Sequence, residues 1–115
     1  MLFRSNELGL ALLDMMSPFI FGCKGLRLSA KEHIFFSQSQ PVGFILFARN
    51  LRDPAQIKNL CAELRNSVGW YAPIMIDQEG GRVARLGKPY WFEFPAALDQ
   101  ANHPNSKRLF WLRGR

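Results

Sequence analysis

Two carboxylates, an amide and two glycines follow directly on an apolar run in Ile76-Asp77-Gln78-Glu79-Gly80-Gly81-Arg82-Val83. Such an abrupt change is typical of a buried parallel strand that leads into an active-site loop. In an extended backbone Asp77 and Glu79 lie on one side and Gln78 on the other. A carboxylate pair suggests a glycosidase, with acid and nucleophile about 5 Å apart or acid and base at a greater separation. Spacing alone does not decide this, because such carboxylates more often bind hydroxyl groups, pair with a nearby arginine such as Arg82 or Arg85, or cap helices.

The Gly80-Gly81 pair allows a sharp turn and brings backbone amides close to a ligand. No G-x-G-x-x-G or G-K-[ST] accompanies it, which argues against a nucleotide site. The guanidinium of Arg85 suits a diol or a carboxylate, and the alternative is that it pairs with Glu79. We therefore expect a binding loop here rather than a phosphate cradle.

Three apolar runs predict strands at residues 19–21, 42–48 and 73–76. The second run is continuous rather than alternating, which indicates a strand covered on both faces, and the third is expected to be buried as well. Arg49-Asn50 ends the second run and is expected to face the same mouth as the Asp77 loop. Asn50 is expected to hold the loops together through backbone bonds rather than to contact a ligand.

Helix signals separate these runs. Ser29 and Glu32 form a capping box that predicts a helix from Ala30 to Ser37. Asp53-Pro54 predicts the start of a second helix, and Gly69 its end. The order strand, helix, strand, helix, strand predicts parallel pairing with right-handed crossovers, in a doubly wound sheet or a (β/α)₈ barrel. A length of 115 residues bounds the chain at one domain.

An irregular loop rich in proline and aromatic residues is expected after the third strand. Its rings could stack on a sugar or another ring-shaped ligand, or they could form an apolar lid on the rim, and the sequence favours neither. The residues concerned are Pro89, Tyr90, Trp91, Phe92, Phe94 and Pro95.

Composition excludes several classes. An apolar fraction of 48% argues against disorder. The two lone cysteines, Cys23 and Cys61, are expected to be reduced, and no metal or other cofactor is predicted. The apolar run from Leu8 to Leu13 is interrupted by Asp14, which argues against a signal peptide, and no run is long enough to span a membrane. A cytoplasmic location is the expectation.

The net charge of +6 raises one alternative function. The chain would then be a non-catalytic remnant that acts as a small basic binding protein, with its C-terminal tail on nucleic acid or another polyanion. No basic helix face or known nucleic-acid motif supports this, and a nucleic-acid partner is not expected. Four basic residues crowd the last nine positions, namely Lys107, Arg108, Arg113 and Arg115.

The two strand-end motifs, together with Asp53-Pro54 between them, resemble the N-terminal part of glycoside hydrolase family 3. The motifs are Gly43-Phe44-Ile45-Leu46-Phe47-Ala48-Arg49-Asn50 and Ile76-Asp77-Gln78-Glu79-Gly80-Gly81-Arg82-Val83. More narrowly, they are similar to those of the bacterial β-N-acetylhexosaminidases of peptidoglycan recycling. The resemblance covers roughly residues 17–98, and residues 99–115 form a divergent basic tail that looks like neither a barrel strand nor a clean helix.

The resemblance implies the first three β/α units of a (β/α)₈ TIM barrel and retaining hydrolysis of terminal β-linked N-acetylglucosamine in muropeptides. It also implies that Asp77 and Arg85 bind the sugar without serving as nucleophile, while Gly80, Gly81, Glu79 and Arg82 shape the loop. The family's K-H-F-P-G-H-G segment, its acid/base histidine and its later nucleophilic aspartate have no counterpart here. We therefore interpret the chain as an N-terminal fragment that contains no catalytic residue and is inactive alone.

Overall fold

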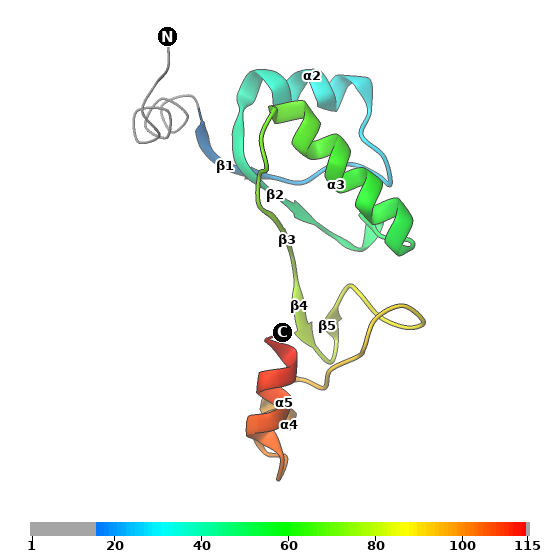
Figure 1. Cartoon of the computed structure of the whole chain (residues 1–115), viewed down its shortest axis with the longest axis vertical. Coiled ribbons are helices and arrows are strands. Elements are labelled where there is room, and N and C mark those ends of the chain that lie inside the picture. The colour runs from blue at the N-terminus through cyan, green and yellow to red at the C-terminus, as the bar shows by residue number, and fades with distance from the viewer. Residues whose placement is uncertain (1–15, 115) are drawn as a thin grey trace. The chain divides into compact units, whose positions relative to one another are not determined.

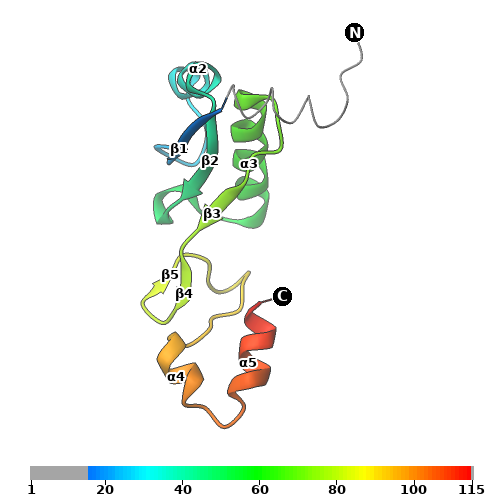
Figure 2. The same cartoon turned by 90° about the vertical axis from the view of Figure 1, so that its left-hand side faces the viewer.

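The computed structural model describes residues 16–114, so the apolar run from Leu8 to Leu13 lies outside the described residues (Figures 1 and 2). The contacts divide the chain into two compact units, one that ends at Met75 and one that begins at Ile76. Each unit is described by itself.

The first unit contains the predicted alternation of strands and helices (Figure 1). Strands β1 and β2 are parallel, with Ser17 opposite Pro41 and Phe21 opposite Phe44, and the sheet order is β1-β2-β3. The predicted α/β class with a parallel β-α-β connection is thus confirmed. The elements are β1 (Ser17–Phe21), α2 (Ala30–Ser39), β2 (Pro41–Leu46), the 3-10 helix η1 (Ala48–Asn50), α3 (Pro54–Val68) and β3 (Ile74–Ile76), whose last residue already belongs to the second unit.

Local caps fix both helices as predicted. The Oγ of Ser29 accepts the N–H of Glu32 at 3.2 Å, and the Glu32 carboxylate accepts the N–H of Ser29 at 2.9 Å. Helix α2 continues to Ser39, beyond the predicted end at Ser37. The Asp53 carboxylate accepts the N–H of Gln56 at 2.9 Å at the start of α3, and Gly69 ends this helix with a φ of +79°.

The core of the first unit lies between strand β2 and helices α2 and α3, which lie side by side in Figure 1. The rings of Phe36 and Phe44 meet edge to face at 5.1 Å between centroids. Leu60 and Leu64 complete this contact from α3, and burial of each such side chain contributes about 1.5–3 kcal/mol. Gly43 lets the next strand approach, because a Cβ there would lie 3.0 Å from the Pro73 carbonyl oxygen.

The second unit contains a short antiparallel hairpin and two helices (Figure 2). Gln78 pairs with Ala84 and Gly80 with Val83. The elements are β4 (Gln78–Gly80), β5 (Val83–Ala84), α4 (Ala97–Ala101) and α5 (Ser106–Arg113). The expectation that residues 106–115 would not form a clean helix is wrong for Ser106–Arg113, where Lys, Arg and Leu are good helix formers.

Candidate functional site

The side chain of Gln78 closes the hairpin beyond its last paired residues. Its Oε1 accepts the N–H of Arg85 at 2.9 Å and that of Leu86 at 3.0 Å. Its Nε2 donates to the carbonyl of Leu86 at 2.8 Å. The Gln78 side-chain amide thus takes the place of backbone pairing where β4 and β5 separate. It thereby holds the backbone of Arg85 in place. The sequence indicated only that Gln78 points away from Asp77 and Glu79, toward no identified partner.

The turn between β4 and β5 uses the positive φ angles that glycine allows. The φ angles of Gly80 and Gly81 are +92° and +61°, in the left-handed region that favours glycine. A Cβ on Gly80 would collide with the Arg113 side chain and the Pro95 carbonyl oxygen. The N–H of Gly81 donates to the carbonyl of Phe94 at 3.0 Å. The turn is therefore packed against the segment that follows the aromatic loop.

Arg113, at the end of α5, binds the other side of the turn. Its Nη2 donates to the carbonyls of Glu79 at 2.6 Å and Pro95 at 2.8 Å, and its guanidinium lies 5.2 Å from the ring centroid of Phe94. Sequence reasoning placed Arg113 in a divergent tail and missed this role. No local signal could have found it, because its partner Glu79 is 34 positions away.

The two predicted sugar ligands flank the hairpin at its open end, opposite the glycine turn. Asp77 sits between β3 and β4, directly before Gln78, and Arg85 directly follows β5. Both side chains are partly exposed, whereas those of Glu79 and Arg82 are exposed. Gln78, which directly follows Asp77, accepts the backbone N–H of Arg85.

The alternative in which Asp77 or Glu79 forms a salt bridge with Arg82 or Arg85 is wrong. Across residues 16–114, the ion pairs within 4.0 Å are Arg27–Glu63, Arg52–Asp53 and Lys88–Glu93. The buried Nε of Arg85 has no acceptor among the same residues. The charges of the hairpin are therefore not neutralised by one another.

The aromatic loop is only partly packed within its unit. Phe94 lies 4.9 Å from Phe92 and receives Arg113, whereas the side chains of Tyr90 and Phe92 are exposed. A hollow of about 540 Å³ separates the hairpin from this loop. Neither predicted sugar ligand lines it; its lining residues are Gly81, Ala84, Leu86, Gly87, Glu93, Phe94 and Pro95.

In the first unit, Asn50 holds two loops together, as predicted. Its Nδ2 donates to the carbonyls of Cys23 at 3.0 Å and Gly25 at 2.8 Å, and its Oδ1 accepts the N–H of Phe47 at 2.9 Å. The neighbouring Arg49 also donates to Cys23, through Nε at 3.0 Å. The end of β2 is thus joined to the loop after β1. Burial raises the pKa of the Cys23 thiol to about 11, with a smaller contribution from Glu32, so this cysteine is protonated at neutral pH.

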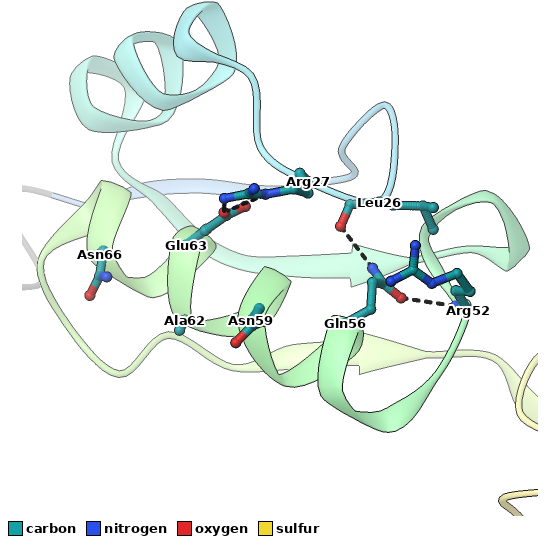
Figure 3. A pocket seen from close by; sticks show the side chains of 8 residues that line it. All are labelled: Leu26, Arg27, Arg52, Gln56, Asn59, Ala62, Glu63 and Asn66. Carbon is teal, nitrogen blue, oxygen red and sulfur yellow. Dashed lines mark hydrogen bonds and ion pairs between the residues drawn. The ribbon is translucent and has the colours of Figure 1, made fainter.

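A polar groove of about 480 Å³ on the outer side of α3 is not a comparable candidate (Figure 3). Its arginines are already paired, Arg27 with Glu63 and Arg52 with Asp53. The Gln56 amide donates to Leu26 and accepts the N–H of Arg52, both at 2.8 Å. These groups hold the loop before α2 against α3, which is a structural role.

Within the described part of the chain, no group of three or more His, Cys, Asp or Glu side chains is arranged to hold a metal ion. None of the helices described there combines the length and the apolar character that crossing a bilayer requires. Both described cysteines are free.

Comparison with known proteins supplies clear relatives. The chain is 34% identical over 95 residues to a β-hexosaminidase of Pseudomonas aeruginosa strain PAO1, which covers 83% of this chain and 28% of that protein. It is 38% identical over 97 residues to a β-hexosaminidase of Haemophilus ducreyi, with 82% and 28% covered. The chain thus spans about 28% of the length of these curated relatives. No family model matches it.

Solved structures agree with the sequence comparison. Native NagZ from Neisseria gonorrhoeae superposes with a TM-score of 0.69 at 27% identity, over 86% of this chain and 29% of that one. The same protein in complex with N-trifluoroacetyl-D-glucosamine gives 0.67 at 26% identity, over 87% and 28%. A glycoside hydrolase family 3 β-N-acetylglucosaminidase from Paenibacillus gives 0.62 at 34% identity, over 73% and 17%.

Proposed function

Because this chain belongs to glycoside hydrolase family 3, as the N-terminal part of a β-hexosaminidase, we propose that it supplies sugar-binding residues for hydrolysis of terminal β-linked N-acetylglucosamine. The substrate class is the cell-wall muropeptide. Asp77 accepts hydrogen bonds from sugar hydroxyls, and Arg85 donates to the same sugar. The cytoplasmic location remains a prediction from the sequence.

One observation carries the proposal: Asp77 and Arg85 directly flank the paired residues Gln78 and Ala84, yet their charged side chains form no ion pair with each other. Gln78 directly follows Asp77, and its side chain binds the backbone N–H of Arg85. Neither the Asp77 carboxylate nor the Arg85 guanidinium forms an ion pair within residues 16–114. A carboxylate and a guanidinium left unpaired in this way suit a polyhydroxylated ligand. That a relative was crystallised with a glucosamine derivative supports the same ligand class.

The described residues provide no acid/base histidine or nucleophile of the family pattern, so the chain alone binds sugar without hydrolysing it. Positioning without the covalent step gives little turnover. Release of a chromophore from a β-N-acetylglucosaminide by the purified chain, abolished by Asp77→Asn, would overturn the claim of inactivity.

Binding is tested by titrating the purified chain with N-acetylglucosamine and following backbone amide shifts by NMR. Asp77→Asn and Arg85→Gln should each weaken affinity about tenfold or more, because a hydrogen bond to a charged group contributes about 1.5–3 kcal/mol. Asp99→Asn is the matched control, since this exposed carboxylate on α4 has no hydrogen bond among residues 16–114. Equal affinities for all four proteins would rule out the assignment of Asp77 and Arg85.

No observation favours the alternative of a polyanion-binding tail. Arg113 is engaged with Glu79 and Pro95, which leaves Lys107 and Arg108 as the exposed basic residues of α5. Retention on heparin that falls steeply with salt and is lost on Lys107→Ala, Arg108→Ala would reinstate it.

A further inference from the structure

The three hydrogen bonds of Gln78 join parts of the chain that carry the proposed sugar ligands. Gln78 directly follows Asp77, and its amide binds Arg85 and Leu86. The distance between the Asp77 and Arg85 backbones is therefore set by this side chain as well as by the pairing of Gln78 with Ala84. We propose that Gln78 is a positioning residue of the sugar site, which acts by fixing the backbone from which the Arg85 guanidinium reaches the ligand.

The chemistry of the amide explains why glutamine suits this place. The backbone N–H of Arg85 and the backbone N–H of Leu86 each need an acceptor, and the Leu86 carbonyl needs a donor. A neutral amide offers both on one planar group, whereas a glutamate offers only acceptors. Glutamate would also place a negative charge against the Leu86 carbonyl. Alanine would leave all three backbone groups without this partner.

The β-ladder does not supply these bonds itself. Gln78 pairs with Ala84 at the end of β5, so Arg85 lies just beyond the last paired residue. Without the Gln78 amide, the backbone N–H groups of Arg85 and Leu86 would lose the hydrogen bonds that hold them beside β4. Precise placement of a ligand-binding group depends on such support, because a group that is poorly held binds with a larger entropic cost.

This inference rests on the proposed function, and a double-mutant cycle with Arg85 tests it. The affinity of N-acetylglucosamine is measured for the full chain, for Gln78→Ala, for Arg85→Ala and for both together. Gln78→Ala should weaken binding about five- to tenfold. In the Arg85→Ala background the same change should weaken it less than twofold, because the group that Gln78 positions is gone.

Backbone amide exchange supplies a readout that does not depend on sugar. In Gln78→Ala the Arg85 and Leu86 amides should lose protection at least tenfold, while the amides of α3 stay unchanged. Gln78→Glu covers the case in which alanine unfolds the hairpin: it keeps the acceptor, so both amides should stay protected and sugar affinity should fall by a smaller factor. Glu93→Gln is the control, because its 3.4 Å bond to the N–H of Lys88 lies in the same loop without touching Arg85.

Three outcomes decide the matter. Equal losses from Gln78→Ala with and without the Arg85 guanidinium would overturn the positioning role. Unchanged affinity in Gln78→Ala, with binding lost in Asp77→Asn, would overturn it while the proposed function stands. If neither Asp77→Asn nor Arg85→Ala alters sugar binding, the proposed function fails, and the positioning role fails with it.

Discussion

At the scale of single residues, buried amides carry much of the order in this chain. Asn50 is fully buried and binds the backbone of two loops, and Gln56 does the same for Leu26 and Asn50. Gln78, which is half-buried, binds irregular backbone in the same way in the second unit. Each amide offers a donor and an acceptor without a charge, which is what irregular backbone needs where strands end. Replacing one of these amides by alanine therefore destabilises the fold mainly by leaving backbone N–H and carbonyl groups without hydrogen-bond partners.

We expect Asn50→Ala to lower the free energy of unfolding by about 2–4 kcal/mol, because the Phe47 N–H and two carbonyls lose their buried partner. Urea unfolding followed by circular dichroism measures this. Asn59→Ala is the control, since the Asn59 side chain is exposed on α3 and forms no hydrogen bond in the described part of the chain. A change below 0.5 kcal/mol in Asn50→Ala, taken as roughly the limit for ordinary surface substitutions, would contradict the role of Asn50.

At the scale of elements, the sequence predicted the helices correctly because their ends are set by hydrogen bonds between residues close in the chain. The caps at Ser29, Asp53 and Gly69 lie within a few residues of their partners, so the helices could be predicted almost to their ends. The Gly80-Gly81 pair indicated a turn but not the pairing of Gln78 with Ala84, and no local signal indicated the contact of Arg113 with Glu79. Both depend on how the chain returns to itself, which local patterns do not encode.

Three carboxylates at these caps and loops make the first unit sensitive to acid. The Arg52 guanidinium and then the Gln56 N–H lower the pKa of Asp53, and the Leu28 N–H, followed by Arg27, lowers the pKa of Glu63. Burial alone would raise the pKa of Glu32, but hydrogen bonds from Ser29 and Lys24 outweigh it and the pKa is lowered. A lowered pKa in the folded state means that the ionised form stabilises the fold.

This stabilisation is fully present above the ordinary values of 3.8 for Asp and 4.5 for Glu, and it is lost as the pH falls through the lower folded values. The urea midpoint of the first unit should therefore stay flat from pH 7 to about 5 and fall below about 4.5. Glu63→Gln should make the fall shallower, whereas Asp99→Asn should leave it as it is. A midpoint that rises on acidification would refute the assignment.

At the scale of the whole molecule, the sheet of the first unit exposes apolar side chains. Among the described residues β1 pairs with β2 alone, and Phe19 and Ile20 are 57% and 49% exposed. Met75 on β3 is 40% exposed. An edge strand with apolar faces favours pairing with another polypeptide.

The isolated 115-residue chain should consequently self-associate at micromolar concentrations, as measured by analytical ultracentrifugation. Ile20→Thr combined with Phe19→Ser should shift it toward monomer, because both changes remove apolar surface from the edge strand. Leu98→Ser removes an apolar side chain of α4 that is 73% exposed, more than either Phe19 or Ile20, and should have little effect. Monomeric behaviour of the unchanged chain at high concentration would contradict the prediction.

The contact between Arg113 and the glycine turn bears on how this protein can be shortened. A truncation after Leu98, the predicted end of the resemblance to the family, would remove what the sequence presents as a divergent tail. It would strip the Glu79 and Pro95 carbonyls of their guanidinium and leave Phe94 without its cation. Expression boundaries for crystallisation or NMR should therefore retain α5 through Gly114, even though the family motifs stop well before it.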